Sequence, residues 1–240
     1  MSEAILVEGL TKAYNGKTVV DHLNLSVKSG TVFGLLGANG AGKSTTIECI
    51  LGTKQADGGT VRLLGQDPKK KRRALFQHVG VQFQEGDYQK EIRVSELCEE
   101  TASLYRKSAD WRGLCEQFGI GDKANTAVKS LSGGERQRLF IVLALIPQPE
   151  LVFLDELTTG LDAKARRGVW KTLESLKEQG LTIFLTSHFM DEVEALCDEI
   201  CILKKGTPVF RGTVEEAKRQ CGCEHFEDAY LRLSDEEVDA

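Results

Sequence analysis

The chain has 240 residues, 41% of them hydrophobic and 28% charged, which is typical of one water-soluble globular domain with ample material for a core. Its longest apolar run, LFIVLALIP, has roughly half of the ~20 residues that a membrane helix needs, so no membrane span is expected. The net charge of −5 argues against a nucleic-acid surface over the whole domain.

The N-terminal sequence and the cysteines give weak signals about the cellular compartment and about metal binding. The beginning, MSEAILVEGL, has no basic segment before its apolar residues, so a secretory signal is not expected and the sequence predicts a cytoplasmic protein. The seven cysteines are an odd number scattered through apolar segments, which favours a reducing compartment without disulfides. Cys197 and Cys201 are four residues apart, and Cys221 and Cys223 form a C-x-C. With His225 as the only histidine nearby, core thiols are favoured over a metal site.

The first third of the chain predicts strands. Residues 4–14 and 17–27 are apolar and β-branched, and the Asn15-Gly16 pair between them is a strong hairpin signal. Residues 59–67 predict one more strand and turn. These segments together indicate an antiparallel β-subdomain.

A phosphate-loop pattern lies within this region. GANGAGKS, residues 37–44, fits G-x-x-x-x-G-K-[ST], with an apolar strand before it and a helical segment after it, as the pattern requires. Glycines let backbone N–H groups approach phosphate oxygens, and the helix start adds its positive dipole end. Lys43 is expected to reach the β- and γ-phosphates of ATP, and the Ser44 hydroxyl to bind Mg²⁺. A glycine-rich structural turn is the alternative. The nucleotide-binding residues predicted here are Gly37, Asn39, Gly40, Gly42, Lys43, Ser44 and Thr45.

A basic run, PKKKRR, extends from Pro68 to Arg73. Such a run can form a nucleic-acid or localisation patch. The simpler interpretation is a solvated face at the start of a short helix. We therefore expect no nucleic-acid partner.

The middle of the chain predicts helices. Apolar residues recur at helical spacing from about Ser95 to Phe118, and no β-rich run interrupts them before Leu151. We expect a helical insertion that spans residues 86–148. Near its end, LSGGERQR, residues 131–138, has a serine that can cap a helix and two glycines with exposed amides. It predicts a second anion-binding helix start, and because one ATP hardly needs two from one subunit, it could serve another subunit's nucleotide.

Strands and helices alternate after Leu151. Near-continuous apolar strands between amphipathic helices indicate a parallel sheet covered on both faces. The strand in LVFLDE delivers Asp155 to its carboxyl edge, where open α/β sheets bind ligands, so Asp155 is expected to hold Mg²⁺. Glu156 is placed to polarise the attacking water. The end of the chain, residues 221–240, predicts a short acidic tail.

The phosphate loop, LSGGE and LVFLDE, in this order, resemble the nucleotide-binding subunit of an ABC transporter over nearly the whole chain. The resemblance implies one α/β domain over residues 1–240: a P-loop NTPase core with a mostly parallel sheet, an N-terminal antiparallel β-subdomain and an inserted helical subdomain. It implies an ATPase that uses ATP and Mg²⁺. The stretch 185–213 and the ending FEDAYLRL resemble bacterial export-type ATPases of drug, antibiotic and lipid exporters, so export is favoured over import.

Further site residues follow from the resemblance alone. Tyr14 matches the aromatic residue that stacks on adenine. Gln84 matches the glutamine that joins the sheet core to the helical subdomain and approaches Mg²⁺ and water. His188 matches the switch histidine that contacts the γ-phosphate, and with Glu156 and Gln84 it makes up the expected catalytic set. Taken singly, these three residues could instead be a strand aromatic, a loop amide and a strand-end cap.

The resemblance also implies a dimer. Ser132, Gly133 and Gly134 match the signature that closes over the γ-phosphate bound by the opposite protomer, and Asp162 matches the aspartate of the loop that crosses the dimer interface. Separate transmembrane permease subunits are implied, which would hold the protein at the inner face of the cell membrane. One departure is Leu157, where the family usually has proline; leucine predicts a looser turn around Glu156.

Two other functions were weighed against this one. A regulator from the same superfamily, acting on ribosomes or DNA, is disfavoured because the chain has one cassette, no sustained heptads and no broad basic surface. A catalytically dead binding module conflicts with the presence of Lys43, Asp155, Glu156 and His188.

Overall fold

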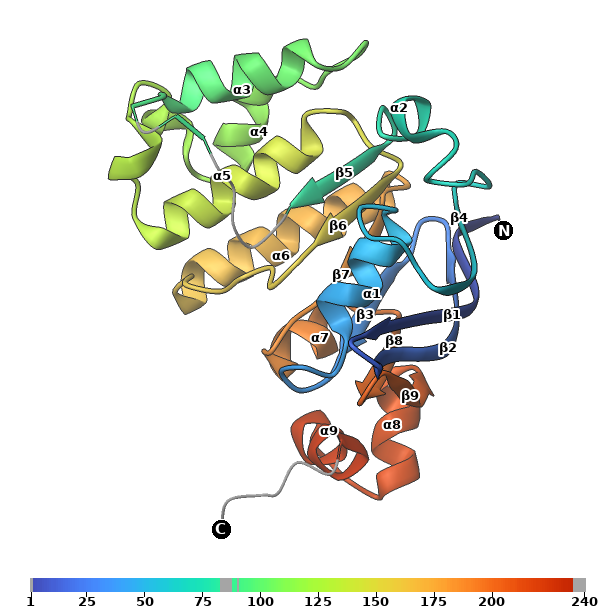
Figure 1. The fold of residues 1–240 in the computed structure, drawn as a ribbon. Coiled ribbons are helices and arrows are strands. Elements are labelled where there is room, and N and C mark those ends of the chain that lie inside the picture. The colour runs from blue at the N-terminus through green and yellow to red at the C-terminus, as the bar shows by residue number, and fades with distance from the viewer. Residues whose placement is uncertain (1, 83–87, 90, 235–240) are drawn as a thin grey trace. The chain divides into compact units, whose positions relative to one another are not determined.

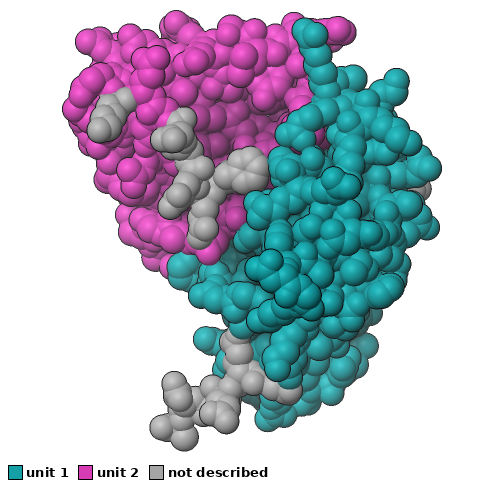
Figure 2. All heavy atoms as spheres, in the orientation of Figure 1, with its two compact units in different colours: residues 1–75, 186–240 teal, residues 76–185 magenta. Residues whose placement is uncertain are grey.

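The fold is that of a computed structural model, which describes residues 2–82, 88–89 and 91–234. The chain divides into two compact units, coloured separately in Figure 2: residues 1–75 with 186–240 form unit 1, and residues 76–185 form unit 2. Each unit has its own strands and helices (Figure 1). Within the described residues, no helix combines the length and the apolar composition that crossing a membrane requires.

Unit 1 begins with the predicted hairpin. Strand β1 (Glu3–Tyr14) pairs antiparallel with β2 (Lys17–Lys28), and Tyr14 lies opposite Lys17. The turn residues have φ angles of 49° at Asn15 and 79° at Gly16, the left-handed pair that a tight hairpin requires. Strand β4 (Gly58–Leu63) pairs with the other edge of β1, which confirms the antiparallel N-terminal sheet.

A second set of strands in unit 1 carries the phosphate loop. Strand β3 (Val32–Leu36) is buried along its whole length and runs parallel to β8 (Glu199–Lys204). Such burial on both faces is expected of a parallel strand and explains its continuous apolar sequence. Strand β9 (Thr207–Gly212), which the sequence pattern did not predict, pairs antiparallel with β8. The helices that accompany these strands are α1 (Lys43–Ile50), α2 (Arg72–Leu75) and α7 (Met190–Leu196).

The C-terminal region of unit 1 contains two helices, and the second lies within the acidic tail predicted for residues 221–240, which the structure describes as far as residue 234. Helices α8 (Val214–Cys221) and α9 (Phe226–Ser234) lie side by side next to β9 in Figure 1. Phe226 is 1% exposed and Tyr230 7%, and both belong to a core cluster with residues of β8 and β9. The acidic residues of α9 therefore occupy its outer face, while its apolar residues complete the core of unit 1.

Unit 2 combines a parallel sheet with a group of helices. Strands β5 (Val79–Gln82) and β7 (Thr182–Leu185) each run parallel to β6 (Leu151–Leu154), which lies between them. Strand β5 was not predicted. The helices are α3 (Val94–Ser103), α4 (Trp111–Gln117), α5 (Gly133–Leu145) and α6 (Ala163–Glu178). The first three lie inside the predicted insertion, whose bounds at 86–148 stay a prediction because its first residues fall outside the described ones.

Candidate functional site

The phosphate loop connects β3 to α1 in unit 1. Its glycines have the left-handed φ angles that this tight path needs, 142° at Gly37 and 104° at Gly42. A Cβ atom at Gly42 would lie 2.6 Å from the carbonyl oxygen of Val19, so no larger residue fits there without a shift of the backbone. Gly42 is the N-cap of α1, and no side chain makes a capping hydrogen bond there. The first turn of α1 has no acidic residue. This helix start therefore offers its N–H groups to an external anion.

Lys43 is buried within the same loop. Its side chain is 9% exposed, and Nζ donates hydrogen bonds to the carbonyl oxygens of Gly37 at 2.5 Å and Ala38 at 3.2 Å. The ammonium group is thus held across the loop, with a geometry set before any ligand arrives. Asn39, Gly40 and Ser44 are exposed in the same segment, and Thr45 is half-buried.

Tyr14 is one of the few exposed aromatic side chains in the described part of the chain, with 39% of its surface accessible. The Lys12 Nζ lies 5.1 Å from the centre of its ring and the Lys54 Nζ lies 5.8 Å from it. Lys12 is itself bound to Asp57 at 2.9 Å, and this hydrogen bond raises the pKa of the lysine. The exposed ring of Tyr14 thus has two cations over it.

His188 is exposed and follows buried Ser187. The Ser187 Oγ accepts a hydrogen bond from the backbone N–H of Phe189 at 3.0 Å, just before α7 begins. This bond fixes the backbone on both sides of His188.

In unit 2, buried strand β6 leads directly to Asp155 and Glu156, which are both half-buried. The amide group of Gln82 donates to the carbonyl oxygen of Asp155 at 3.2 Å, and the Asp155 N–H donates to the Gln82 carbonyl oxygen at 3.3 Å. The backbone of Asp155 is thus fixed to the neighbouring strand. Glu156 has a φ of 50°, which is uncommon for a residue other than glycine.

The turn after Glu156 is held more firmly than the leucine at position 157 predicted. The Leu157 side chain is fully buried. The backbone N–H of Thr159 donates to the Glu156 carbonyl oxygen at 3.2 Å. The Gln137 side chain of α5 donates to the carbonyl oxygens of Glu156 at 3.0 Å and Leu157 at 2.8 Å. Packing and hydrogen bonds thus restrict the backbone of this turn, which a proline would restrict through its fixed φ.

The second glycine-rich helix start, at α5, has a different chemistry from the first. The Ser132 Oγ accepts from the Glu135 N–H at 3.2 Å, and the Glu135 carboxylate accepts from the Ser132 N–H at 2.8 Å. These bonds, with Lys123 at 3.1 Å, lower the pKa of Glu135 to about 2. Gly133 is exposed, and Gly134 packs closely on Gly160 and Leu161. The open pair of amides expected from the sequence therefore has a carboxylate of the chain beside it.

Asp162 is exposed and caps α6, where its Oδ1 accepts from the Ala165 N–H at 2.8 Å. Gln84 lies outside the described residues. The remaining predicted residues fall into two groups: unit 1 contains Tyr14, the phosphate loop and His188, and unit 2 contains Ser132–Gly134, Asp155, Glu156 and Asp162. Sequence reasoning missed Gln137, whose only signal was its place on the helix that follows LSGG.

Comparison with known proteins identifies the chain. Residues 20–159 match the protein family described as ABC transporter, a span that includes Lys43, Ser132 and Glu156. This chain belongs to the ABC transporter family. As a member of it, the protein binds and hydrolyses ATP.

Relatives and solved structures agree with this ABC assignment. The chain is 42% identical to the Nod factor export ATP-binding protein I of Ralstonia nicotianae, over 92% of this chain and 71% of that protein. It is 36% identical to the daunorubicin/doxorubicin resistance ATP-binding protein DrrA of Streptomyces peucetius, over 92% of this chain and 68% of that protein. A solved ATP binding subunit of an ABC transporter superimposes with a TM-score of 0.88 at 25% identity, covering 96% of this chain and 99% of the other.

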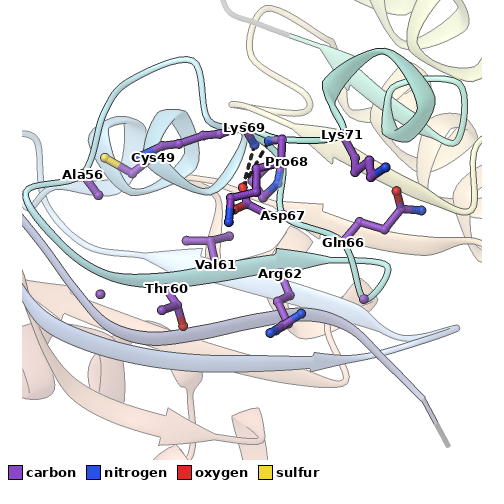
Figure 3. A pocket seen from close by; sticks show the side chains of 13 residues that line it. Cys49, Ala56, Thr60, Val61, Arg62, Gln66, Asp67, Pro68, Lys69 and Lys71 are labelled. Carbon is purple, nitrogen blue, oxygen red and sulfur yellow. Dashed lines mark hydrogen bonds and ion pairs between the residues drawn. The ribbon is translucent and has the colours of Figure 1, made fainter.

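A separate hollow in unit 1 of the ABC chain is lined in part by Pro68 and the three lysines of the basic run. It measures about 640 Å³ and lies over β4, with Arg62 and the lysines at 69–71 along it (Figure 3). The Asp67 carboxylate accepts from the Lys69 N–H at 2.9 Å, which lowers the pKa of Asp67. The three lysines are exposed, and α2 starts at Arg72. The run is thus a solvated face that leads into a short helix, as the simpler interpretation predicted.

Proposed function

We propose that two copies of this ABC ATPase enclose two ATP molecules, and that the cycle of closing and opening drives export through separate membrane subunits. Each ATP would lie between the phosphate loop of one copy and Ser132–Gly134 of the other. The observation that carries the proposal is the similarity, over 92% of this chain, to proteins named as export ATP-binding proteins. The printed names of these relatives, an export and a resistance ATP-binding protein, favour export over the alternative, a regulator without a membrane partner.

The binding step follows from the phosphate loop. The α1 start and the Lys43 ammonium group supply positive charge where the β- and γ-phosphates would lie. The phosphate oxygens would replace the Gly37 and Ala38 carbonyl oxygens as acceptors for Lys43, so little rearrangement is needed. Tyr14 would stack on the adenine ring.

The oxygen donors in the chain fit Mg²⁺. Ser44 offers an exposed hydroxyl and Asp155 a half-buried carboxylate, which are the hard oxygen ligands that this ion prefers. Gln84 would be a third ligand. No group of three or more His, Cys, Asp or Glu side chains in the described ranges is arranged for a metal. Bound Mg²⁺ would neutralise charge that develops on the β- and γ-phosphates.

Hydrolysis would depend on Glu156. Its carboxylate would accept a proton from the attacking water, while His188 contacts the γ-phosphate and Asp162 lies at the dimer interface. Because each chain carries both halves of the site, head-to-tail pairing closes with two-fold symmetry. Loss of the γ-phosphate removes the charge that attracts both helix starts, and the dimer opens. The membrane subunits would convert this motion to alternating access and would select the cargo.

The substitution Glu156→Gln tests the catalytic and dimer roles together. ATP binding should be retained, because the amide keeps the shape of the side chain. Turnover should fall roughly 10²–10⁴-fold, as expected for loss of a positioned base. An ATP-dependent dimer should accumulate and elute early in size-exclusion chromatography. Glu150→Gln, an exposed glutamate just before β6, is the matched control and should behave as wild type.

Two outcomes would contradict the proposal: near-normal hydrolysis by Glu156→Gln, or a variant that remains monomeric at saturating ATP. The membrane partner is tested separately, by gentle extraction of a tagged copy and mass spectrometry of the co-purifying integral proteins. Co-sedimentation with ribosomes instead of membranes would favour the regulator.

A further inference from the structure

Gln137 connects the signature helix to the catalytic turn of the same chain. It lies in the second turn of α5, whose N-cap is Ser132. Its Nε2 donates two hydrogen bonds to consecutive carbonyl oxygens, those of Glu156 at 3.0 Å and Leu157 at 2.8 Å. One carboxamide thus fixes the carbonyl groups before and after Leu157, the residue that follows the proposed catalytic glutamate.

The turn at Glu156 needs such a contact. A left-handed backbone at a residue other than glycine costs about 1–2 kcal/mol, so it persists only where surrounding contacts impose it. Position 157 is leucine, which does not fix φ as proline does. Other contacts at the turn include the Thr159–Glu156 backbone hydrogen bond and the buried Leu157 side chain. Neither of them reaches the Leu157 carbonyl oxygen, whereas Gln137 does.

We propose that Gln137 is a positioning residue: it fixes the backbone of Glu156 so that the carboxylate is held ready for the attacking water. This inference rests on the proposed catalytic role of Glu156. Gln137 acts through the two carbonyl groups and not by contact with ATP or water.

The position of Gln137 on α5 also connects the catalytic turn to the helix start that would face the other copy's ATP. In the proposed dimer, Ser132–Gly134 at the start of this helix faces the ATP bound by the other copy. Gln137 lies three residues after Gly134, only ~5 Å further along a rigid helix. The first turn of α5 also packs on Gly160 and Leu161, beyond the catalytic turn. A shift of α5 on contact with one nucleotide would therefore move the glutamate that serves the other nucleotide.

Three variants separate positioning from simple structural support. Gln137→Met keeps the length and removes the N–H donors, Gln137→Lys keeps a donor, and Gln77→Met is the matched control. The Gln77 side chain also makes hydrogen bonds to the backbone of unit 2: it donates to the Leu104 carbonyl oxygen and accepts from the Arg106 N–H. Neither residue belongs to the catalytic turn. The measurements are ATP turnover of the full chain, ATP affinity and the thermal midpoint.

We expect Gln137→Met to lower kcat about tenfold or more while the dissociation constant for ATP changes less than about twofold, the signature of an interaction needed for the chemical step alone. Gln137→Lys should recover most of this loss. In a Glu156→Gln background, Gln137→Met should have no further effect on the residual turnover, because two residues that act as one unit are not additive. Gln77→Met should leave kcat unchanged.

The inference is overturned if Gln137→Met lowers the thermal midpoint but not kcat, or if it lowers turnover equally with and without Glu156. It is also overturned if Gln137→Lys shows no recovery while it folds as wild type. Failure of the proposed function looks different, because Glu156→Gln alone would then keep its turnover.

Discussion

Helix α1 begins at Lys43 with a glycine N-cap, no side-chain cap and no acidic residue in its first turn. Helix α5 begins at Gly133 with a serine N-cap and a full capping box in which Glu135 returns to the Ser132 N–H. Both starts follow a glycine-rich sequence, and both have the positive end of a helix dipole. At α1 that charge is left for a ligand, whereas at α5 a carboxylate of the chain already balances it.

The difference indicates an order of events. A phosphate can enter the α1 start directly, because Lys43 is already held across the loop. At α5 a phosphate would approach beside the charged carboxylate of Glu135, whose pKa the Ser132 hydrogen bonds and Lys123 lower to about 2. We therefore expect the α5 start to be the weaker anion site, which fits the proposal that it meets an ATP already held by another copy. Substitutions at the two helix starts test this asymmetry.

The open helix start should depend on its lysine. In Lys43→Ala, two charge-assisted hydrogen bonds to phosphate are lost, each worth about 1.5–3 kcal/mol, so ATP affinity should fall roughly 10²-fold or more. Titration of a fluorescent ATP analogue measures this loss. Lys28→Ala, an exposed lysine at the end of β2, is the control. Unchanged affinity in Lys43→Ala would remove the phosphate loop from its assigned role.

The N-cap of α1 should tolerate substitution far less than the N-cap of α5. Gly42→Ala places a Cβ 2.6 Å from the Val19 carbonyl oxygen at a φ of 104°. Strain at such a φ costs about 1–3 kcal/mol before the clash is added, so we expect the free energy of unfolding to fall by at least about 2 kcal/mol. Urea unfolding measures it. Gly40→Ala has a positive φ but open space around the Cβ, so it separates the effect of φ from that of the clash.

Local signals in the sequence predicted the elements whose geometry is decided locally. The Asn15-Gly16 turn fixed the hairpin, and the Ser132 cap placed the start of α5. The S-x-x-E spacing from Ser132 to Glu135 is also the pattern of a capping box, and the structure shows that box beside the two glycines. The sequence analysis expected the serine cap but not the return bond from Glu135, which changes the charge at the helix start and leaves the fold unchanged.

Long-range contacts decided what the sequence could not predict. Strand β5 has four residues, too few for a clear period, and it exists because β6 pairs with it. Helix α9 has an acidic composition, but its burial comes from packing on β8 and β9. The contact of Gln137 with Glu156 joins segments nineteen residues apart. No pattern of residue types within either segment predicts it.

The α5 cap should give a moderate effect on stability. Ser132→Ala removes the acceptor for the Glu135 N–H, and loss of a serine cap costs about 0.5–2 kcal/mol. The thermal midpoint should fall by a few degrees, since about 1 kcal/mol corresponds to ~2–4 °C at this size. ATP affinity of the isolated chain should stay within about twofold, because the α1 start holds the nucleotide. A large loss of affinity in the monomer would show that both helix starts serve one ATP.

The smallest effect on stability should come from Glu135→Gln, which keeps the capping box and removes its charge. The folded-state pKa of Glu135, about 2, lies below its unfolded value of about 4.3, so its stabilising effect is present at neutral pH and is lost as the pH falls from about 5 to about 2. Because the side chain is partly exposed, wild type and variant should differ by less than about 1 kcal/mol at pH 7. Urea unfolding should show this difference shrinking at pH 3. Glu174→Gln, an exposed glutamate on α6, should show none.

The same substitution should make the α5 start resemble the α1 start. When the negative charge of Glu135 is removed, the positive end of the helix dipole and the nearby Lys123 remain to attract phosphate. In a Glu156→Gln background, which is expected to trap the ATP-bound dimer, Glu135→Gln should therefore form that dimer at lower ATP concentration, in size-exclusion runs over an ATP series. The shift should shrink in high salt, because it arises from a partly exposed charge. A dimer that needs more ATP would mean that the Glu135 carboxylate helps to hold the phosphate-binding geometry and does not compete with the phosphate.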